Sequence, residues 1–420
     1  MERLLRGQVA LVALAWAALT VQGAAPSGDW PQWRGPQRDD LSTETGLLQE
    51  WPTGGPPLVW HVTELGGGYS GVSLAGGRIF TMGEKGEASY LLALNRADGK
   101  LHWSTKVGKA GAPGWGGFAG PRCTPTVAGD LVFAVSQYGE FICAEAATGK
   151  ERWRKSLTAD LGGELPEWSF AESPLVDGDQ VVCTPGGKAG AIVAMNKGTG
   201  EILWRCQQFT DAAEYASLVP AEIGGVQQYV QLTQSSVAGV AARDGRLLWR
   251  AARKDNVAVI PTPVVSGNQV FVTSGYGVGC NLFEVSQSGD RFKTQQLYAS
   301  KALQNHHGGV VLVGKHIYGH SDSKGWTCLD LATGETAWQE KGKLGKGSLT
   351  YADGHLYLRQ EDGPGTIALI AATPEGYREK GRFDQPHRSA KNSWPHPVVA
   401  GGRLYIRDQE VLLCFDVTKR

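Results

Sequence analysis

The sequence predicts an all-β fold: an eight-bladed β-propeller of four-stranded antiparallel blades, closed by strands from both termini. Three features predict it, namely a recurring glycine turn followed by tryptophan, a repeat interval of 42 to 51 residues, and alternating apolar segments between the turns. The segment Cys328–Trp338 shows the unit clearly, because Thr333 and Gly334 supply a tight turn between two extended runs. One such hairpin cannot bury both faces, so its copies must stack on one another.

The turn glycines set the length of the repeat. Five turns carry a tryptophan four residues after the glycine: Gly99 and Trp103, Gly149 and Trp153, Gly200 and Trp204, Gly245 and Trp249, and Gly334 and Trp338. Gly289 and Gly376 keep the turn without the tryptophan. This interval is typical of a propeller blade. Segments such as Gln269–Thr273 alternate apolar and polar residues, which indicates strands and not a helical repeat.

Residues 1–23 are expected to be a signal peptide. Arg3 and Arg6 precede the apolar run Val9–Val21, and small residues follow it. The run is too short to span a bilayer, and no cysteine precedes Cys123 to serve as a lipoprotein anchor. We expect an exported bacterial protein, periplasmic or secreted, with no transmembrane segment; a retained N-terminal anchor is the alternative.

Residues 24–57 are expected to form an N-terminal arm. The stretch Asp29–Pro36 contains two tryptophans and an arginine but no blade pattern. We interpret it as an arm that covers one face of the propeller, and a stacking surface for a ligand is the alternative. Residues 58–420 are then one propeller domain, in which Leu58–Trp60 completes the blade begun by Arg403–Asp416 and removes the open edges.

Charge and cysteine content narrow the function classes. Lys plus Arg equals Asp plus Glu, at 41 each, so no charge imbalance attracts nucleic acid. The seven cysteines include no C-x-x-C pair, and their odd number leaves at least one thiol unpaired. Cys143, Cys328 and Cys414 each occupy a position at which other blades carry Ala or Gly, six residues before the turn glycine or its expected place. This pattern predicts that the three cysteines pack in the core. Separately, we expect the protein to be a monomer.

The repeated turn resembles the tryptophan-docking motif of the quinoprotein (PQQ-like) eight-bladed propellers. Four copies match it with a polar residue before the turn: Asn95, Asp98, Gly99 and Trp103; Glu145, Thr148, Gly149 and Trp153; Asn196, Thr199, Gly200 and Trp204; and Asp330, Thr333, Gly334 and Trp338. The resemblance implies that each tryptophan packs between neighbouring blades. It also implies two functional classes, because the family contains PQQ- and Ca²⁺-dependent dehydrogenases as well as a non-enzymatic lipoprotein of outer-membrane protein assembly.

Residues at the starts of the inner strands should line the central funnel. The candidates for contact with a ligand or cofactor are Arg122, Trp168, Glu172, His307 and Trp394, and further polar candidates are Tyr69, Asn305, His306 and Lys346. A hydrated polar pore is the alternative interpretation. The spacing of His316, His320 and Asp322 places them on one strand face, but the strand position of His316 is polar in other blades, so we predict no metal site. We expect His306 and His307 to point to opposite faces of a strand.

The glycine-rich segment 108–120, with Pro113, Trp115 and Phe118, is predicted to be a contact surface, a lid or a merely flexible loop. No catalytic residue is predicted. The sequence lacks the adjacent cysteines of PQQ alcohol dehydrogenases and any Cys-x-x-Cys-His haem site. We therefore predict a non-enzymatic binding or scaffold protein of the bacterial cell envelope, which binds an envelope protein or a small ligand at the funnel and loop face. The alternative is a dehydrogenase of alcohols or sugars with PQQ and Ca²⁺ as cofactors.

Overall fold

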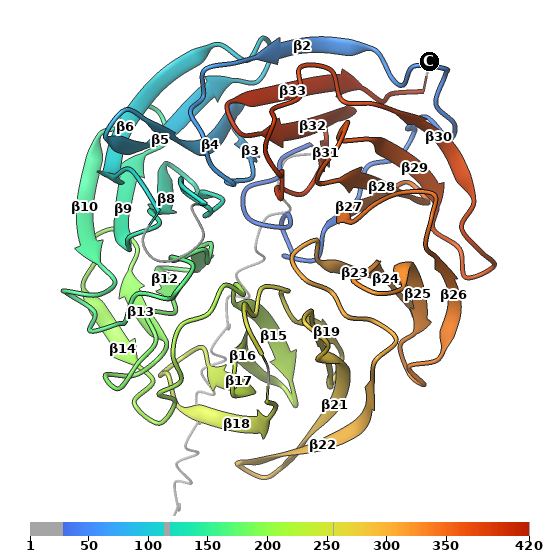
Figure 1. The fold of residues 1–420 in the computed structure, drawn as a ribbon. Helices are drawn as coiled ribbons and strands as arrows, with labels where there is room; N and C mark the ends of the chain where they lie inside the picture. Colours follow the sequence, from blue (N-terminus) through green and yellow to red (C-terminus); the bar gives the residue numbers. More distant parts are fainter. Residues whose placement is uncertain (1–27, 113–117, 255, 420) are drawn as a thin grey trace, which may run out of the picture.

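A computed structural model describes residues 28–112, 118–254 and 256–419. The described residues form 33 strands and no helix, arranged as eight sheets around a central axis, which confirms the predicted propeller (Figure 1). None of these residues forms a helix long and apolar enough to cross a membrane. The expected signal peptide, the first four residues of the arm, Pro113 and Trp115 lie outside the described residues.

The first four blades each run outward from a short inner strand. Blade 1 contains β3 (Ser73–Ala75), β4 (Arg78–Lys85), β5 (Ala88–Asn95) and β6 (Leu101–Lys109). Blade 2 contains β7 (Thr126–Ala128), β8 (Leu131–Val135), β9 (Glu140–Glu145) and β10 (Glu151–Ser156). Blade 3 contains β11 (Leu175–Asp177), β12 (Gln180–Cys183), β13 (Val193–Asn196) and β14 (Ile202–Arg205). Blade 4 contains β15 (Val219–Ile223), β16 (Val226–Leu232), β17 (Ser236–Ala241) and β18 (Leu247–Ala252).

The remaining four blades complete the ring. Blade 5 contains β19 (Val264–Ser266), β20 (Gln269–Ser274), β21 (Gly279–Ser288) and β22 (Arg291–Ser300). Blade 6 contains β23 (Val310–Val313), β24 (His316–Ser321), β25 (Gly325–Asp330) and β26 (Thr336–Glu340). Blade 7 contains β27 (Gly347–Ala352), β28 (His355–Gln360), β29 (Ile367–Ala371) and β30 (Glu379–Phe383). Blade 8 contains β31 (Val398–Ala400), β32 (Arg403–Asp408), β33 (Val411–Asp416) and β2 (Leu58–Val62).

Blade 8 closes the ring with strands from both ends of the chain, as the sequence predicts. The N-terminal strand β2 pairs antiparallel with β33, and Trp60 lies opposite Cys414. The arm adds a further strand, β1 (Leu41–Ser42), which pairs in parallel with β27 of blade 7. The first two and the last described strands are therefore all paired in sheets.

Several docking tryptophans link their blade to the next through the indole N–H, whereas Trp204 and Trp249 donate to a glutamine of their own blade. The Trp153 indole N–H donates to the Lys197 carbonyl in blade 3 at 2.9 Å. A Cβ atom at Gly200, which has a φ of +73°, would lie 2.9 Å from the Trp153 ring, so the turn needs glycine for its conformation and for space. Burial of such rings stabilises the fold. We therefore assign the docking tryptophans a structural role, as the family resemblance implies.

The small residue six positions before the turn glycine lies directly opposite the docking tryptophan. Cys143 pairs with Trp153 and Cys328 with Trp338 across neighbouring strands. All seven cysteines are buried and unpaired, and burial raises the pKa of the Cys143 thiol to about 12. A larger side chain would collide with the indole, which confirms the predicted packing role.

Blade 5 lacks the tryptophan but keeps its function through a tyrosine. The Tyr298 hydroxyl donates to the Leu331 carbonyl of blade 6 at 2.9 Å, and its ring lies 2.8 Å from a Cβ atom built at Gly334. Tyr298 follows Gly289 by nine residues instead of four because β21 and β22 form a longer hairpin. The fixed spacing therefore could not reveal it.

We predict that Tyr298→Ala lowers the free energy of unfolding by about 2–4 kcal/mol, since it removes a ring packed between two blades. Tyr298→Phe should cost about 1 kcal/mol, because only the hydrogen bond is lost. Urea unfolding followed by circular dichroism measures both, with Trp153→Ala as the benchmark for a docking tryptophan. A stability of Tyr298→Ala equal to that of the wild type would contradict this assignment.

Candidate functional site

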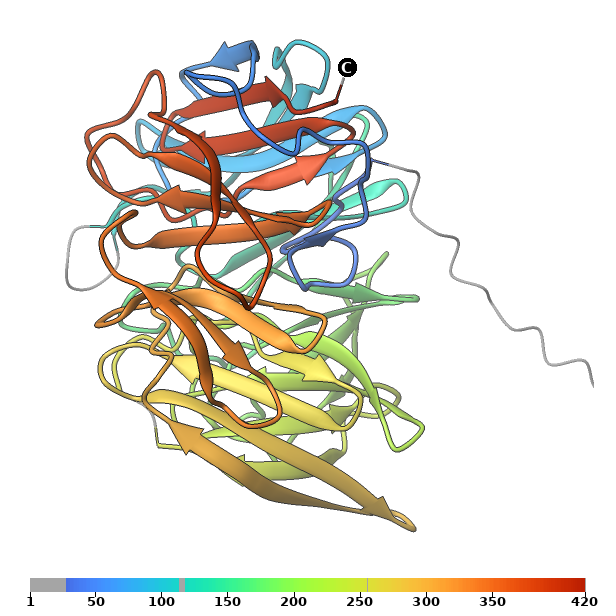
Figure 2. The same ribbon diagram turned by 90° about the vertical axis from the view of Figure 1, so that its right-hand side faces the viewer.

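The N-terminal arm lies across the central axis and contacts every blade. It crosses the centre of the ring (Figure 1), toward the face that is distant in that view, as the side view shows (Figure 2). The hydrogen bonds and ion pairs, in blade order, join Trp30 to Leu74, Pro31 to Val127, Arg38 to Ser173 and Pro174, Arg38 to Leu218, Trp33 to Thr262, Arg34 to Val310, Asp40 to Tyr351, and Asp40 to His396. The segment Trp30–Asp40, called the plug below, therefore occupies the propeller channel.

Two buried arginines anchor the plug. Arg34 pairs with Asp40 at 2.8 Å, and each side chain is only 1% exposed. Asp40 also bonds the Nδ1 atom of His396 at 2.9 Å. Arg38 donates to backbone carbonyls of blades 3 and 4, and its burial lowers its pKa to about 10. Removal of either member of the Arg34–Asp40 pair would leave an uncompensated buried charge.

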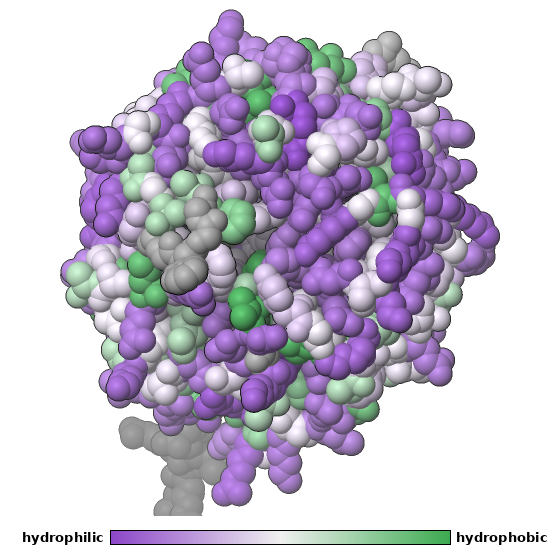
Figure 3. All heavy atoms as spheres, viewed as in Figure 1, coloured by the Kyte–Doolittle hydropathy of each residue, from purple (hydrophilic) through white to green (hydrophobic). Residues whose placement is uncertain are grey.

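The plug closes one end of the channel and leaves a blind pocket of about 280 Å³ at the other. Figure 3 shows this face hollowed near its centre, with hydrophobic residues beside the hollow and hydrophilic residues over most of the periphery. The lining residues are Trp33, Tyr69, Phe118, Arg122, Trp168, Ala171, Ser173, Tyr215, Ser217, Ala258, Ile260, Tyr276, His306, His307, Lys346, Glu361, Asn392, Trp394 and Pro395.

Aromatic rings form much of the pocket wall and its floor. Tyr69 stacks on Trp394 with ring centroids 4.1 Å apart, and Phe118 contacts both Trp394 and Trp168. The indole N–H groups of Trp168 and Trp394 are buried and have no hydrogen-bond partner among the described residues. Since an unpaired buried donor is costly, a ligand with acceptor atoms would stabilise both groups.

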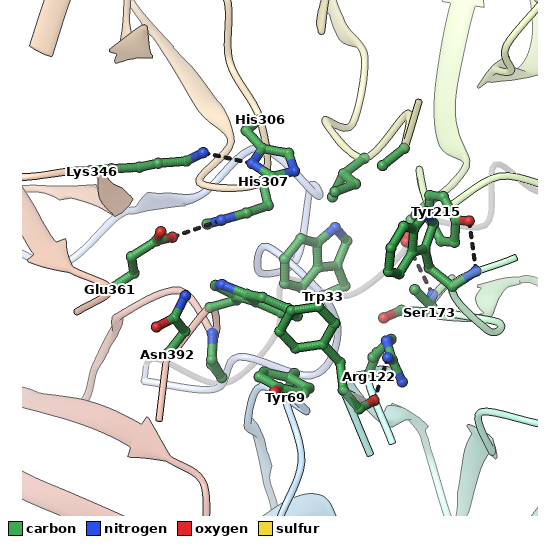
Figure 4. A pocket seen from close by; sticks show the side chains of 18 of the residues that line it. Trp33, Tyr69, Arg122, Ser173, Tyr215, His306, His307, Lys346, Glu361 and Asn392 are labelled. Carbon is green, nitrogen blue, oxygen red and sulfur yellow. Dashed lines mark hydrogen bonds and ion pairs between the residues drawn. The ribbon is translucent and has the colours of Figure 1, made fainter. Parts of the chain in front are cut away.

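Two cations lie on opposite sides of the pocket (Figure 4). The Arg122 guanidinium donates to the carbonyls of Gly120 and Phe118 and lies 5.6 Å from the centroid of the Tyr69 ring. Lys346, on the opposite side, pairs with Asp322 at 2.9 Å. Arg122 has no carboxylate in ion-pair distance among the described residues, so it is the cation available to an anionic ligand.

A chain of hydrogen bonds runs from Lys346 to the pocket rim. The ammonium of Lys346 contacts Nδ1 of His306 at 2.6 Å, and Nε2 of His306 contacts the Tyr276 hydroxyl at 2.9 Å. An ammonium only donates, so Nδ1 must accept, and the proton of a neutral His306 lies on Nε2. Burial, with His307 and Lys346 adding to its effect, lowers the pKa of His306 to about 3, consistent with a neutral ring. The Tyr276 hydroxyl proton is then free to point elsewhere.

His307 forms a second pair with a carboxyl group. Its Nε2 atom lies 2.7 Å from Oε2 of Glu361. Burial raises the pKa of Glu361 to about 7 and lowers that of His307 to about 3. The two shifts have one cause: burial in the pocket wall disfavours the charged form, so both the carboxyl group and the imidazole favour the neutral form.

The structure brings together most of the residues predicted to line the funnel. Arg122, Trp168, His307 and Trp394 all line the pocket, as do Tyr69, His306 and Lys346. The expectation that His306 and His307 point to opposite faces of a strand is wrong: they precede β23, and their ring centroids are 4.5 Å apart.

Two predicted candidates lie outside the pocket lining. Glu172 is 5% exposed and accepts hydrogen bonds from the backbone N–H of Thr184 at 2.6 Å and from its hydroxyl at 3.0 Å. Asn305 donates to the His320 carbonyl instead. Both side chains are held by their own inner and middle strands, which sequence periodicity alone does not show.

The lining residues that sequence reasoning missed include the aromatic Tyr215 and Tyr276 and the ionisable Glu361, and Trp33 was covered only by the alternative interpretation of the arm as a stacking surface. The pair Trp30 and Trp33 was noticed in the arm, but its place on the axis depends on long-range contacts. Glu361 directly follows β28, the second strand of blade 7. Residues at the ends of the second strands could therefore have been named as further candidates for the pocket.

The donor set does not fit the calcium ion of a quinoprotein dehydrogenase. Ca²⁺ prefers several carboxylate and carbonyl oxygens. Among the described residues, no group of three His, Cys, Asp or Glu side chains is placed to hold a metal ion. Glu361, the carboxyl group in the lining, lies against His307 and favours its neutral form, and Asp322 pairs with the ammonium of Lys346.

A family model described as the outer membrane protein assembly factor BamB matches residues 111–340, which is more than half of the chain. The chain belongs to this family of PQQ-like propellers. No curated protein matches it.

Solved structures share the fold of this PQQ-like propeller at low sequence identity. BamB from Moraxella catarrhalis is 14% identical with a TM-score of 0.57, over 81% of this chain and 94% of that one. Quinohemoprotein alcohol dehydrogenase from Comamonas testosteroni is 11% identical with a TM-score of 0.65, over 95% of this chain and 82% of that one. The computationally designed protein Ika8 is 12% identical with a TM-score of 0.61, over 86% and 99%. These likenesses concern the fold, which hosts both classes of protein.

Glu172 should give the PQQ-like propeller a pH-dependent stability. Burial raises the pKa of this carboxyl to about 7 from 4.5, so the folded state binds more protons than the unfolded state between these values. The free energy of unfolding should then fall by up to about 3 kcal/mol as pH rises through this window. Glu361, whose pKa is also raised to about 7, contributes a fall of its own in this window. Glu172→Gln should therefore reduce the fall by the share of Glu172, and Glu87→Gln, on an exposed turn, should leave it unchanged. Urea unfolding at pH 4.5, 6 and 8 measures the difference; parallel curves for wild type and Glu172→Gln would refute the shift.

Proposed function

We propose that this PQQ-like propeller is a non-enzymatic binding protein of the bacterial cell envelope, whose funnel binds a small ligand that has a flat apolar face and an anionic or acceptor-rich group. The observation that carries the proposal is the blind aromatic pocket, in which Trp168 and Trp394 carry unpaired buried indole N–H groups. An aromatic cavity with a few polar groups in its lining is typical of a ligand site. Arg122, the lining cation without a carboxylate partner among the described residues, favours an anionic group.

The proposed location follows from the sequence and from the family. Residues 1–23 have the pattern of a signal peptide, and the matching family model is described by an outer membrane assembly factor. An envelope protein that docks over the funnel face is a second partner class compatible with this location. The pocket favours a small ligand, because it is a cavity of about 280 Å³ with aromatic rings in its lining.

The PQQ-dependent dehydrogenase is the alternative. The aromatic walls and Arg122 suit a planar anion such as PQQ. The donor set lacks a place for Ca²⁺, whose positive charge would polarise the quinone carbonyl. We therefore assign the pocket to binding and derive no reaction from it.

We predict that anilinonaphthalene sulfonate (ANS), a flat aromatic anion, binds the purified mature protein near one per chain with enhanced fluorescence. Arg122→Gln should weaken this binding about tenfold, because one charge-assisted contact of about 1.4 kcal/mol is lost. Arg243→Gln, an exposed arginine outside the pocket, should bind ANS like the wild type. Fluorescence titration gives the dissociation constants.

Equilibrium dialysis against PQQ, with and without Ca²⁺, separates the two functions. Competition between PQQ and ANS that is independent of Ca²⁺ agrees with a metal-free anion site. Stoichiometric PQQ binding only in the presence of Ca²⁺ would favour the dehydrogenase. Absence of any saturable ANS binding to the wild type would refute the proposed funnel site.

A further inference from the structure

We infer that the binding site extends onto the plug at one residue, Trp33, and that the flat part of the ligand stacks on the face of its ring. This inference rests on the proposed function of the funnel, and it assigns to the arm more than the covering role that its sequence indicates. It also implies that ligand enters and leaves through one face, since Trp30–Asp40 occupies the channel on the other.

The position of Trp33 is fixed from several directions. Its indole N–H donates to the Thr262 hydroxyl of blade 5 at 3.0 Å. Its ring contacts the His396 ring of blade 8 with centroids 4.5 Å apart, and His396 is itself held by Asp40. The next residue, Arg34, is tied to blade 6. The indole is therefore held in one orientation before any ligand arrives.

The exposed part of Trp33 is apolar. Since Thr262 takes the only polar atom of the indole, the surface offered to the pocket is the ring itself. Figure 4 shows Trp33 in the middle of the pocket, between the Arg122 and Lys346 sides. A flat ligand lying on this ring would bring its edge toward Arg122 on one side of the pocket. Stacking of this kind recognises a ring face, and the wall groups recognise the edge.

The neighbouring tryptophan shows that sealing the channel does not require this arrangement. Trp30 is 2% exposed, bonds to Leu74 through its backbone and does not line the pocket. Trp33, in contrast, is only half-buried although it lies on the axis of the molecule. A residue that served only to seal the channel would bury its ring, as Trp30 does.

The test compares four variants of the full-length mature protein by ANS titration and urea unfolding. Trp33→Ala should weaken ANS binding at least tenfold, and Trp33→Leu, which keeps apolar volume without a flat face, should weaken it nearly as much. Trp33→Phe should lose less than threefold, because a ring face remains. Trp30→Phe is the matched control in the same segment, and its affinity for ANS should equal that of the wild type.

The outcomes separate this inference from the proposed function. If wild-type ANS binding depends on Arg122 but Trp33→Leu binds as tightly as wild type, the funnel site stands and the role of Trp33 is refuted. If Trp33→Ala is too unstable to titrate, the comparison of Trp33→Leu with Trp33→Phe decides the matter. If the wild type shows no saturable ANS binding, both ideas fail. Equal weakening by Trp30→Phe and Trp33→Phe would show a structural role only.

Discussion

The buried ion pair between Arg34 and Asp40 is the contact on which the centre of this molecule depends. It joins two ends of a short loop on the propeller axis, where Asp40 also reaches His396 of blade 8 and Arg34 reaches blade 6. A propeller without a plug has an open channel lined by inner strands. Here the loop makes at least one hydrogen bond or ion pair to every blade, so the arm is integrated into the ring and gives the pocket a floor.

A second constraint holds the outside of the ring. Several docking tryptophans pack on a glycine turn in the following blade and lie opposite a small residue of their own blade, as Trp153 does with Gly200 and Cys143. At the joint after blade 5, Tyr298 takes this place. Because the joint needs a ring that packs on the next blade, the residue, its spacing and its hydrogen-bond partner can change while the joint persists.

These two constraints divide the molecule into outer joints between blades and an inner surface around the axis. The outer joints are similar in most blades, whereas the inner strands begin with different residues, and these meet only at the axis. Arg122, Trp168 and Trp394 come from blades 2, 3 and 8, yet they face one cavity above Trp33. The same ring of blades could hold a cofactor, a ligand or a protein partner. The side chains that line the cavity therefore decide between these functions, and the fold does not.

The sequence by itself determined the architecture and the closure of blade 8, because the glycine turns and tryptophans are local signals that recur every 42 to 51 residues. It also placed Arg122, Trp168, His307 and Trp394 at the funnel, since strand starts face the axis. Only the tertiary structure decided that Glu172 turns away from the pocket and that Trp33 enters it. Those outcomes depend on contacts between residues far apart in the chain, and a repeat pattern carries no information about them.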